Sequence, residues 1–388
     1  MKKLSNLTGA SVVYLFPAIA LILSLFAKET SEAARTALYL CLDVVIPSLF
    51  PFFVLSRLAV PYLSGFSCPA FLKYLTGKFF RLPYYTLVTI LLGYLSGYPT
   101  GAKLARDMFD ERVLDSRQAS KMIAVANNSS PLFIIGTIGA GLFKSIKIGF
   151  LLLAIHWISG IIAAFFIVRL ADTEKSGQAP SIRNSSDHKR EKPARFLLMI
   201  PSAIEESAIL CLKLTGYIVL FAVLTELLSR LGLFSLLGQM VGLFCASSQP
   251  AASEFISAVL RGLMEITSGA QAISRLNGIS IHLQLAAVSL IVGFAGFSVH
   301  MQIMGIMKDT QAKYRTLFAG KLLHGIIAFF ITLAVTTLAP MTVETANITF
   351  GFPFNFSGIR LFTVGLLLIS LVIAPYQSGN RRKKQTIK

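Results

Sequence analysis

Three groups of polar residues interrupt the otherwise apolar segments of this chain. The first is the motif Ser-Gly-Tyr-Pro-Thr-Gly-Ala-Lys at 96–103. Its glycines let neighbouring backbones approach closely, and Pro99 removes a backbone donor, so free amide and carbonyl groups are expected here. Lys103 adds a cation, and the group is suited to binding an anion. The alternative is a tight hairpin in which the Lys103 side chain reaches along apolar surface to the water.

The second group is Asn-Asn-Ser-Ser-Pro at 127–131, in the middle of a predicted membrane span at 119–143. Pro131 interrupts the hydrogen-bond ladder near Asn127, so a second half-helix is expected to begin there. The free N–H groups at the start of that half-helix carry partial positive charge and favour an anion. The alternative is a polar contact that holds two helices together.

The third group lies at 261–271, in the second half of the chain. Charged side chains within a membrane segment usually mark a functional site. The alternative is that Arg261 and Glu265, four residues apart on one helix, neutralise each other. In a later span, His300 is either a proton relay or a structural hydrogen-bonding residue. The expected substrate-binding residues are Ser96, Tyr98, Thr100, Lys103, Asn127, Asn128, Ser129, Ser130, Glu265, Thr267, Ser268, Gln271 and Ser298.

Known catalytic and metal-binding patterns are absent from the sequence. It has no phosphate-binding Walker motif, no GxSxG or HExxH motif and no paired-carboxylate arrangement. The four cysteines form no CxxC pair and stand in or beside apolar segments, as small hydrophobic residues do. We therefore expect no catalytic residue, metal or cofactor, and a protein that is not an enzyme.

Hydrophobic composition indicates a polytopic, all-α membrane protein. Apolar residues make up 54% of the chain and charged residues 14%, whereas soluble proteins carry about 25% charged residues. Two apolar segments, 84–105 and 251–275, are broken by glycine, proline or charge, and we expect both to be re-entrant hairpins. The first span contains Pro17 and lacks a clear cleavage site, so we expect it to be retained. The eight expected spans are 11–27, 36–60, 119–143, 146–170, 205–231, 281–307, 317–340 and 359–377.

The net charge of +18 reflects basic residues that gather in alternate loops, as the positive-inside rule requires. This pattern places the linker 171–195 and the basic tail in the cytoplasm and 341–358 outside. Only Lys144 and Lys147 fall on the opposite side from the rest. No basic stretch interleaves with aromatic residues in a soluble module, so a nucleic-acid partner is not expected. The expected partners are the bilayer, a small anionic substrate and a coupling ion, either proton or sodium.

The two halves of the chain align with an almost constant spacing. Thr-Gly-Ala at 100–102 matches Ser-Gly-Ala at 268–270, an offset of 168 (269 − 101). The same offset aligns Ser130 with Ser298. Each half then has three crossings and one hairpin, and an odd number of crossings inverts the second copy. The predicted organisation is an N-terminal span (1–35), a first repeat (36–170), a linker (171–195), an inverted second repeat (196–340) and a final span with a basic tail (341–388).

The stretches SGYPTGAKL, NNSSPLFIIGTIGAG and EITSGA resemble the YlbJ family of sporulation integral membrane proteins, over roughly residues 40–310. The resemblance implies a nucleoside-recognition (Gate) domain in each repeat. It also implies transport of dipicolinic acid across the outer forespore membrane. The residues by themselves favour a transporter with an anion-binding site. An ion-coupled nucleoside or metabolite carrier, and a non-transporting scaffold of a sporulation complex, remain as alternatives.

Overall fold

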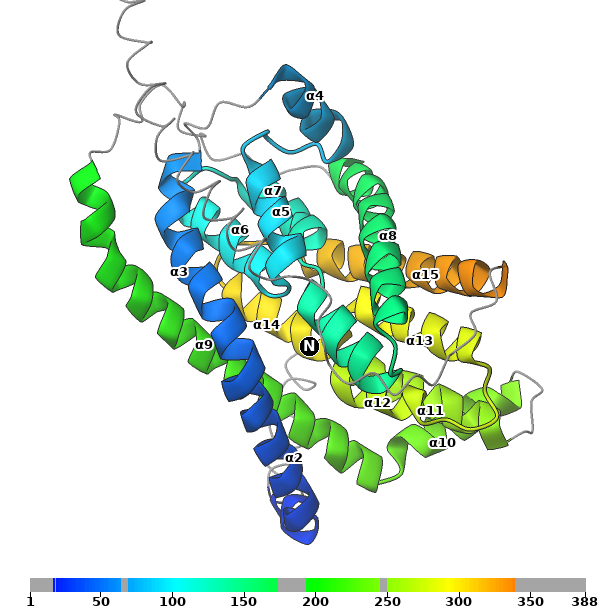
Figure 1. Ribbon diagram of the computed structural model, residues 1–388. Coiled ribbons are helices and arrows are strands. Elements are labelled where there is room, and N and C mark those ends of the chain that lie inside the picture. The colour runs from blue at the N-terminus through cyan, green and yellow to red at the C-terminus, as the bar shows by residue number, and fades with distance from the viewer. Residues whose placement is uncertain (1–16, 18, 64–68, 174–192, 245–249, 339–388) are drawn as a thin grey trace, which may run out of the picture. The chain divides into compact units, whose positions relative to one another are not determined.

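All regular elements in the described part of the chain are helices, which confirms the predicted all-α class there. The computed structural model describes residues 17, 19–63, 69–173, 193–244 and 250–338 (Figure 1). In the first half the elements are α2 (Ala27–Leu40), η1 (Cys41–Val45), α3 (Ile46–Leu63), α4 (Ala70–Phe79), α5 (Thr86–Ser96), α6 (Thr100–Asp110), α7 (Ser116–Ala126), η2 (Leu132–Leu142) and α8 (Ile146–Thr173). In the second half they are α9 (Pro193–Arg230), α10 (Leu233–Phe244), α11 (Pro250–Met264), α12 (Ile266–Ser274), α13 (Ile281–Phe294), α14 (Gly296–Ile306) and α15 (Tyr314–Leu338).

Five helical segments in the described residues are long and apolar enough to cross a membrane. They are Ala27–Pro61, Ile146–Ala171, Leu197–Arg230, Ile281–Ile306 and Tyr314–Leu338. Each contains or closely matches a predicted span. The predicted span 119–143 is instead divided between α7 and η2, at the break that its Asn-Asn-Ser-Ser-Pro sequence indicates. Residues 11–16 and 18 of the predicted span 11–27, residues 174–192 of the linker and the predicted span 359–377 lie outside the described residues.

Two helices begin earlier than the hydrophobicity of the sequence suggests. The helix that contains the predicted span 36–60 already begins at Ala27, because the polar stretch 28–35 is rich in alanine and glutamate, which favour a helix. The predicted span 205–231 lies within α9, which has 38 residues and is therefore about 57 Å long. Hydrophobicity locates the part of a helix that lies in lipid, and helix propensity allows the same helix to continue beyond it.

The order of elements in the first half recurs in the second. A long helix, a short connecting helix, a pair of short helices, a broken helix and a final long helix follow one another in both. Three element boundaries recur at the offset of 168 found in the sequence. They are the ends of α5 and α11 (264 − 96), the ends of α7 and α13 (294 − 126) and the starts of α8 and α15 (314 − 146).

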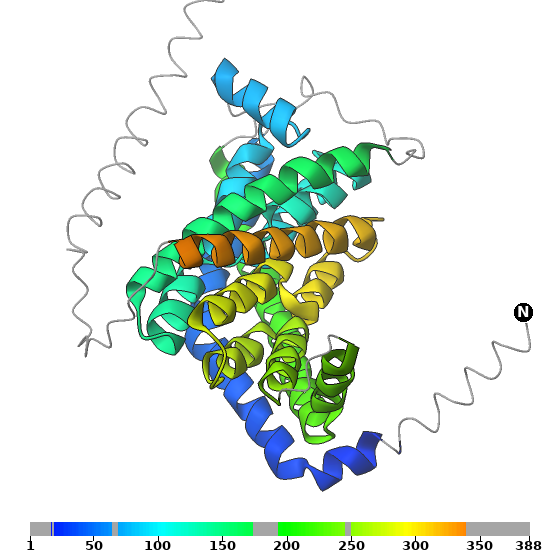
Figure 2. The ribbon, with the colours of Figure 1, turned by 90° about the vertical axis from the view of Figure 1, so that its right-hand side faces the viewer.

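The helices of the two halves pack against one another. Figure 2 shows α8 and α15 crossing, and these two helices are in direct contact. In addition, α7 packs against α15 while its counterpart α13 packs against α8. In the same way α6 contacts α14, and α12 contacts η2. The shared core includes Met108 and Ile123 from the first half and Ile291 from the second, all fully enclosed.

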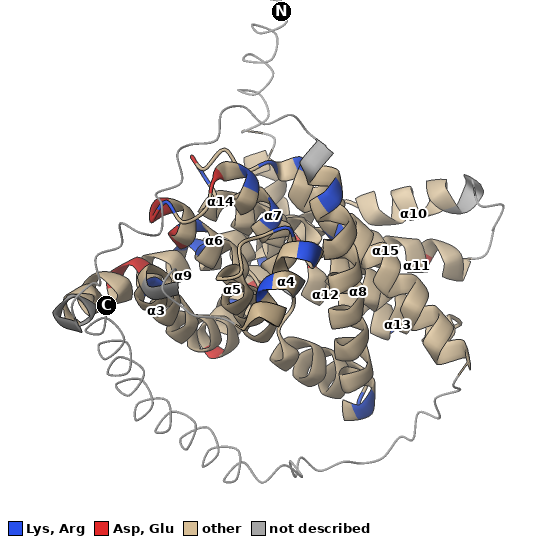
Figure 3. Ribbon diagram, turned by 90° about the horizontal axis from the view of Figure 1, so that it is seen from above, with Lys and Arg blue, Asp and Glu red and all other residues tan. Residues whose placement is uncertain are grey.

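Basic residues from three segments, at 81, 106–121 and 308–313, lie together in the structure. A guanidinium nitrogen of Arg106 donates to the carbonyl oxygen of Lys308, and the backbone N–H of Lys313 donates to the Ser120 hydroxyl at 3.0 Å. Lys121 Nζ lies 3.5 Å from the carbonyl oxygen of Arg81. Figure 3 shows Lys and Arg grouped over α4, α6, α7 and α14. The basic loops of both halves therefore share one side of the molecule.

Candidate substrate site

The break between α7 and η2 follows directly from its sequence. A capping box of Asp115 and Gln118 starts α7, which ends at Ala126. Asn127 then adopts an extended conformation, with φ −94° and ψ 103°. Proline cannot donate to the carbonyl four residues earlier and its ring clashes with it, so Pro131 frees the carbonyl oxygen of Asn127. The break therefore leaves the carbonyl oxygen of Asn127 without a backbone donor in the protein interior.

Hairpin one, formed by α5 and α6, lies directly against this break. The Asn127 side chain accepts a hydrogen bond at 2.9 Å from the backbone N–H of Ala102, a group in the first turn of α6 that also donates to the carbonyl oxygen of Pro99. A Cβ atom at Gly101 would stand 2.3 Å from the carbonyl oxygen of Ala126, and this contact requires glycine. The tip of hairpin one therefore lies directly against the Asn127–Ser130 segment.

A second break separates α13 from α14. Ala295 takes a left-handed conformation with φ 75°, and the carbonyl oxygen of Phe294 leaves the helical ladder. His300 Nε2 lies 2.8 Å from that oxygen and must donate to it, because a carbonyl only accepts. Of the two predicted roles, the structure therefore supports the structural one for His300. Hairpin two, formed by α11 and α12, packs against this second break, since a Cβ at Gly296 would stand 3.2 Å from the Ile266 side chain.

Glu265 and Arg261 do not form the ion pair that their spacing allows. The Glu265 carboxylate caps α12, accepting from the backbone N–H groups of Thr267 at 2.9 Å and Ser268 at 2.7 Å. Arg261 pairs instead with Glu226 of α9 at 3.0 Å. Because Glu265 occupies the helix N-terminus with its own carboxylate, this half-helix is not open to a substrate anion in the present conformation.

The remaining predicted residues fall into two groups. Most make local or structural hydrogen bonds: Ser96 to Leu92, Tyr98 to the carbonyl of Val292 on α13, Ser130 to the N–H of Phe133, Ser268 to Glu265 and Ser298 to Gln302. Gln271 is exposed on α12. In contrast, the buried hydroxyls of Thr100 and Ser129 have no hydrogen-bond partner among the described residues. These two hydroxyls remain free to bind a ligand.

Lys103 does not point to the Asn127–Ser130 segment, although both were predicted to bind the substrate. Its ammonium group lies 2.5 Å from Asp107 and 3.9 Å from Glu206 of α9. Asp107 also accepts from the Ser56 hydroxyl at 3.0 Å. Burial raises the pKa of Asp107 above its ordinary value, and the nearby Lys103 opposes that rise.

The cation at the break is Lys321 of α15, which was not among the predicted site residues. It is only 1% exposed. Its ammonium group donates to the freed carbonyl oxygen of Asn127 and lies 3.4 Å from the Asn128 side-chain oxygen. Among the described residues, no carboxylate lies within ion-pair distance of it. A lysine inside the predicted span 317–340 was a signal that could have identified it.

Two buried histidines adjoin Lys321. The backbone N–H of Ser129 donates to His156 Nε2 at 3.0 Å, and His324 Nε2 donates to the carbonyl oxygen of His156 at 2.9 Å. Their rings are 4.5 Å apart. The Tyr94 hydroxyl and His156 Nδ1 are buried without a partner among the described residues. We name Tyr94, Asn128, Ser129, His156, Lys321 and His324 the central polar cluster.

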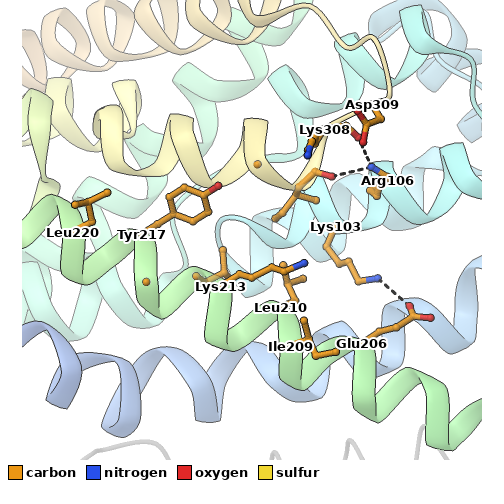
Figure 4. Close-up of a pocket in the computed structure, with 14 residues that line it drawn as sticks. Lys103, Arg106, Glu206, Ile209, Leu210, Lys213, Tyr217, Leu220, Lys308 and Asp309 are labelled. Atoms are coloured by element: carbon orange, nitrogen blue, oxygen red, sulfur yellow. Dashed lines mark hydrogen bonds and ion pairs between the residues drawn. The ribbon is translucent and has the colours of Figure 1, made fainter. Parts of the chain in front are cut away.

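The central polar cluster is closed in this conformation. The adjoining void, between η2, α8, α13 and α15, has a volume of about 10 Å³, which is space for about one water. A larger space opens between α9 on one side and α6 and α14 on the other, with a volume of about 730 Å³ (Figure 4). We call it the α9 cleft. Its charged lining residues are Lys103, Arg106, Glu206, Lys213, Lys308 and Asp309.

Comparison with known proteins gives one informative match. The chain is 29% identical over 317 residues to the sporulation integral membrane protein YlbJ of Bacillus subtilis (strain 168). The aligned region covers 78% of this chain and 76% of that protein. No family model and no solved structure matches the chain.

Proposed function

Because the chain belongs to the family of the sporulation integral membrane protein YlbJ, we propose that it transports a small organic dianion, dipicolinate, across the outer forespore membrane during sporulation. The family and the apolar helices make it a multi-pass membrane protein. The observation that carries the transport proposal is Lys321, a buried ammonium group held at a helix break with no carboxylate partner among the residues that the structure describes.

Electrostatics explain why such a lysine suits an anion carrier. Transferring an ammonium ion from water into a protein interior costs several kcal/mol, and two neutral oxygens offset only part of that cost. A substrate carboxylate would supply the missing negative charge. The uncommitted hydroxyls of Tyr94, Thr100 and Ser129 are the expected donors to its remaining oxygens.

The repeated architecture supports movement of a substrate through the same region. Transporters built from inverted repeats place the substrate near broken helices where the halves meet, and one half rocks against the other. The recurring boundaries, the two breaks and the paired hairpins match that scheme. We infer that the two halves are inverted copies and that the two hairpins are re-entrant. The closed cluster and the open α9 cleft then correspond to a state that opens to the cytoplasm.

The two alternative functions, a nucleoside carrier and a scaffold protein, would require different features of the protein core. A nucleoside carrier fits the broken helices equally well, but a neutral nucleoside leaves the charge of Lys321 uncompensated. A scaffold protein needs neither a buried lysine nor polar breaks in the core. The unpaired charge of Lys321 therefore favours the dianion.

Spore composition tests the proposal in living cells. Lys321→Met and Asn128→Leu are expected to reduce the dipicolinate content of spores strongly, while membrane levels of the protein stay normal by immunoblot. Lys78→Gln, on the exposed surface of α4, is the matched control and should leave the content unchanged. Normal dipicolinate in both site variants would contradict the proposed site.

A further inference from the structure

We propose that the α9 cleft is a second anion-binding site, which captures a small organic dianion from the cytoplasm through Lys213 and Lys308. This site is separate from the central polar cluster. Its ligand class rests on the proposed function, whereas its existence rests on the cleft itself. The volume of about 730 Å³ falls in the range of about 300–1,000 Å³ that is typical of small-molecule sites.

The cleft contains more positive than negative charge. Its lining carries four cations, Lys103, Arg106, Lys213 and Lys308, and two acids, Glu206 and Asp309. Glu206 is already engaged, since it lies 3.0 Å from Arg57 outside the cleft lining and 3.9 Å from Lys103. Lys103 and Arg106 are paired along α6 with Asp107 and Asp110.

Lys213 and Lys308 are the cations without a carboxylate partner. Neither forms an ion pair within the described part of the chain. They approach the cleft from different walls, Lys213 from α9 and Lys308 from the residues that follow α14. Figure 4 shows Lys213 extending from α9 toward α6, with Lys103 and Lys308 on the facing side. Two separated ammonium groups are complementary to a molecule that carries two carboxylates.

The position of Lys213 on α9 is a second, independent indication. It lies near the middle of the apolar segment Leu197–Arg230, and the side chain of its neighbour Leu212 is 73% exposed on the outer surface. An ammonium group on the lipid face of such a helix is strongly unfavourable. Turning Lys213 into the cleft avoids that cost only if water or an anion fills the cleft. A lysine at this position is therefore expected to serve a ligand.

One wall of the cleft also provides an aromatic surface. Tyr217 follows Lys213 by one turn of α9 and is partly exposed in the cleft. It packs directly over Gly305, where a Cβ atom would stand 2.4 Å from the Tyr217 hydroxyl. An aromatic ring one turn from an ammonium group suits a flat ring that bears a carboxylate. The expected ligand is thus a planar aromatic dicarboxylate.

Binding and flux measurements with the full-length protein test the inference. The variants are Lys213→Gln, Lys308→Gln, the double variant and Lys213→Arg, with Lys78→Gln as the control. Equilibrium dialysis of radiolabelled dipicolinate against protein in nanodiscs measures binding, and proteoliposome uptake measures KM and maximal rate. We expect each single substitution to raise KM roughly fivefold, the double roughly twentyfold and Lys213→Arg little, with the maximal rate unchanged.

Salt dependence separates an electrostatic role from a structural one. In the wild type, KM should rise with ionic strength because salt screens exposed charges, and this dependence should weaken in the double variant. A double variant with wild-type KM and wild-type salt dependence would overturn the inference and leave the proposed function intact. If the wild type transports no dipicolinate, the proposed function fails. In that case, binding of phthalate and of sulfate tests the second site. The inference is wrong if neither anion binds saturably in a way that depends on Lys213 and Lys308.

Discussion

The imidazole rings of His156 and His324 stack 4.5 Å apart, and the two residues are separated by 168 positions (324 − 156). This is the offset that relates the halves of the chain. If the two halves are inverted copies, as proposed, residues at equivalent positions touch only where the two-fold axis passes between them, and this pair then marks the meeting point of the halves. Lys321 lies one turn away, and its own counterpart is the buried Leu153 (321 − 168). The charge of the proposed site therefore comes from the second half, and the helix break from the first.

Lys321→Met should abolish most transport without unfolding the protein. Methionine fills similar space, and relief of the cost of burying an ammonium group should offset the loss of its hydrogen bond to the Asn127 carbonyl oxygen, a loss that costs about 1–3 kcal/mol. Substrate affinity should fall about ten- to a hundredfold, because a bond to a charged group contributes about 1.5–3 kcal/mol. Thermal unfolding in detergent and proteoliposome flux measure the two effects. A variant that unfolds at a much lower temperature than the wild type would show instead that Lys321 is a structural residue.

Gly101→Ala should destabilise the contact between hairpin one and the helix break. The added Cβ would meet the carbonyl oxygen of Ala126 at 2.3 Å, and overpacking of this kind costs about 1–3 kcal/mol. Gly77→Ala, on α4, is the matched control, since no atom lies within 4 Å of a Cβ there. It should be neutral or slightly stabilising. Equal midpoints of thermal unfolding for the two variants would show that the hairpin is not closely packed.

Glu265→Ala should lower stability through the loss of a helix cap, by about 0.5–2 kcal/mol. Glu265→Gln should retain much of that stability, because the amide oxygen still accepts from one of the two backbone N–H groups of Thr267 and Ser268. Substrate affinity should change little in Glu265→Gln. A large rise in KM with normal stability would show instead that Glu265 binds the substrate, as the sequence predicted.

The linker should be cytoplasmic, because Lys and Arg accumulate in it. Ser185→Cys, in a background whose four native cysteines are replaced, should react with a membrane-impermeant maleimide only after the cells are opened. A cysteine introduced at 341–358 should react in intact cells. Labelling of Ser185→Cys in intact cells would contradict both the orientation and the inverted repeat.

Local sequence signals predicted the elements of the fold well. Pro131 and the preceding polar residues located the first break, and the recurrence of Gly101 as Gly269 led us to propose the repeat. Helix extent was less well predicted, since residues 28–35 ahead of the predicted span 36–60 and residues 193–204 ahead of the predicted span 205–231 also form helix. The partners of charged side chains could not be predicted, because they depend on packing between distant segments. Lys103 turns to Asp107 and Glu206, and Lys321 reaches Asn127 across 194 residues of sequence.

Uptake of dipicolinate by the purified protein in liposomes tests the transport claim most directly. Vesicles that contain the wild-type protein should accumulate radiolabelled dipicolinate in a saturable manner and take up picolinate, which has a single carboxylate, far more slowly. Vesicles with Lys321→Met should take up dipicolinate far more slowly than those with the wild type, while those with Lys78→Gln should match the wild type. Equal uptake by wild-type and protein-free vesicles, with the protein folded and correctly inserted, would contradict the account.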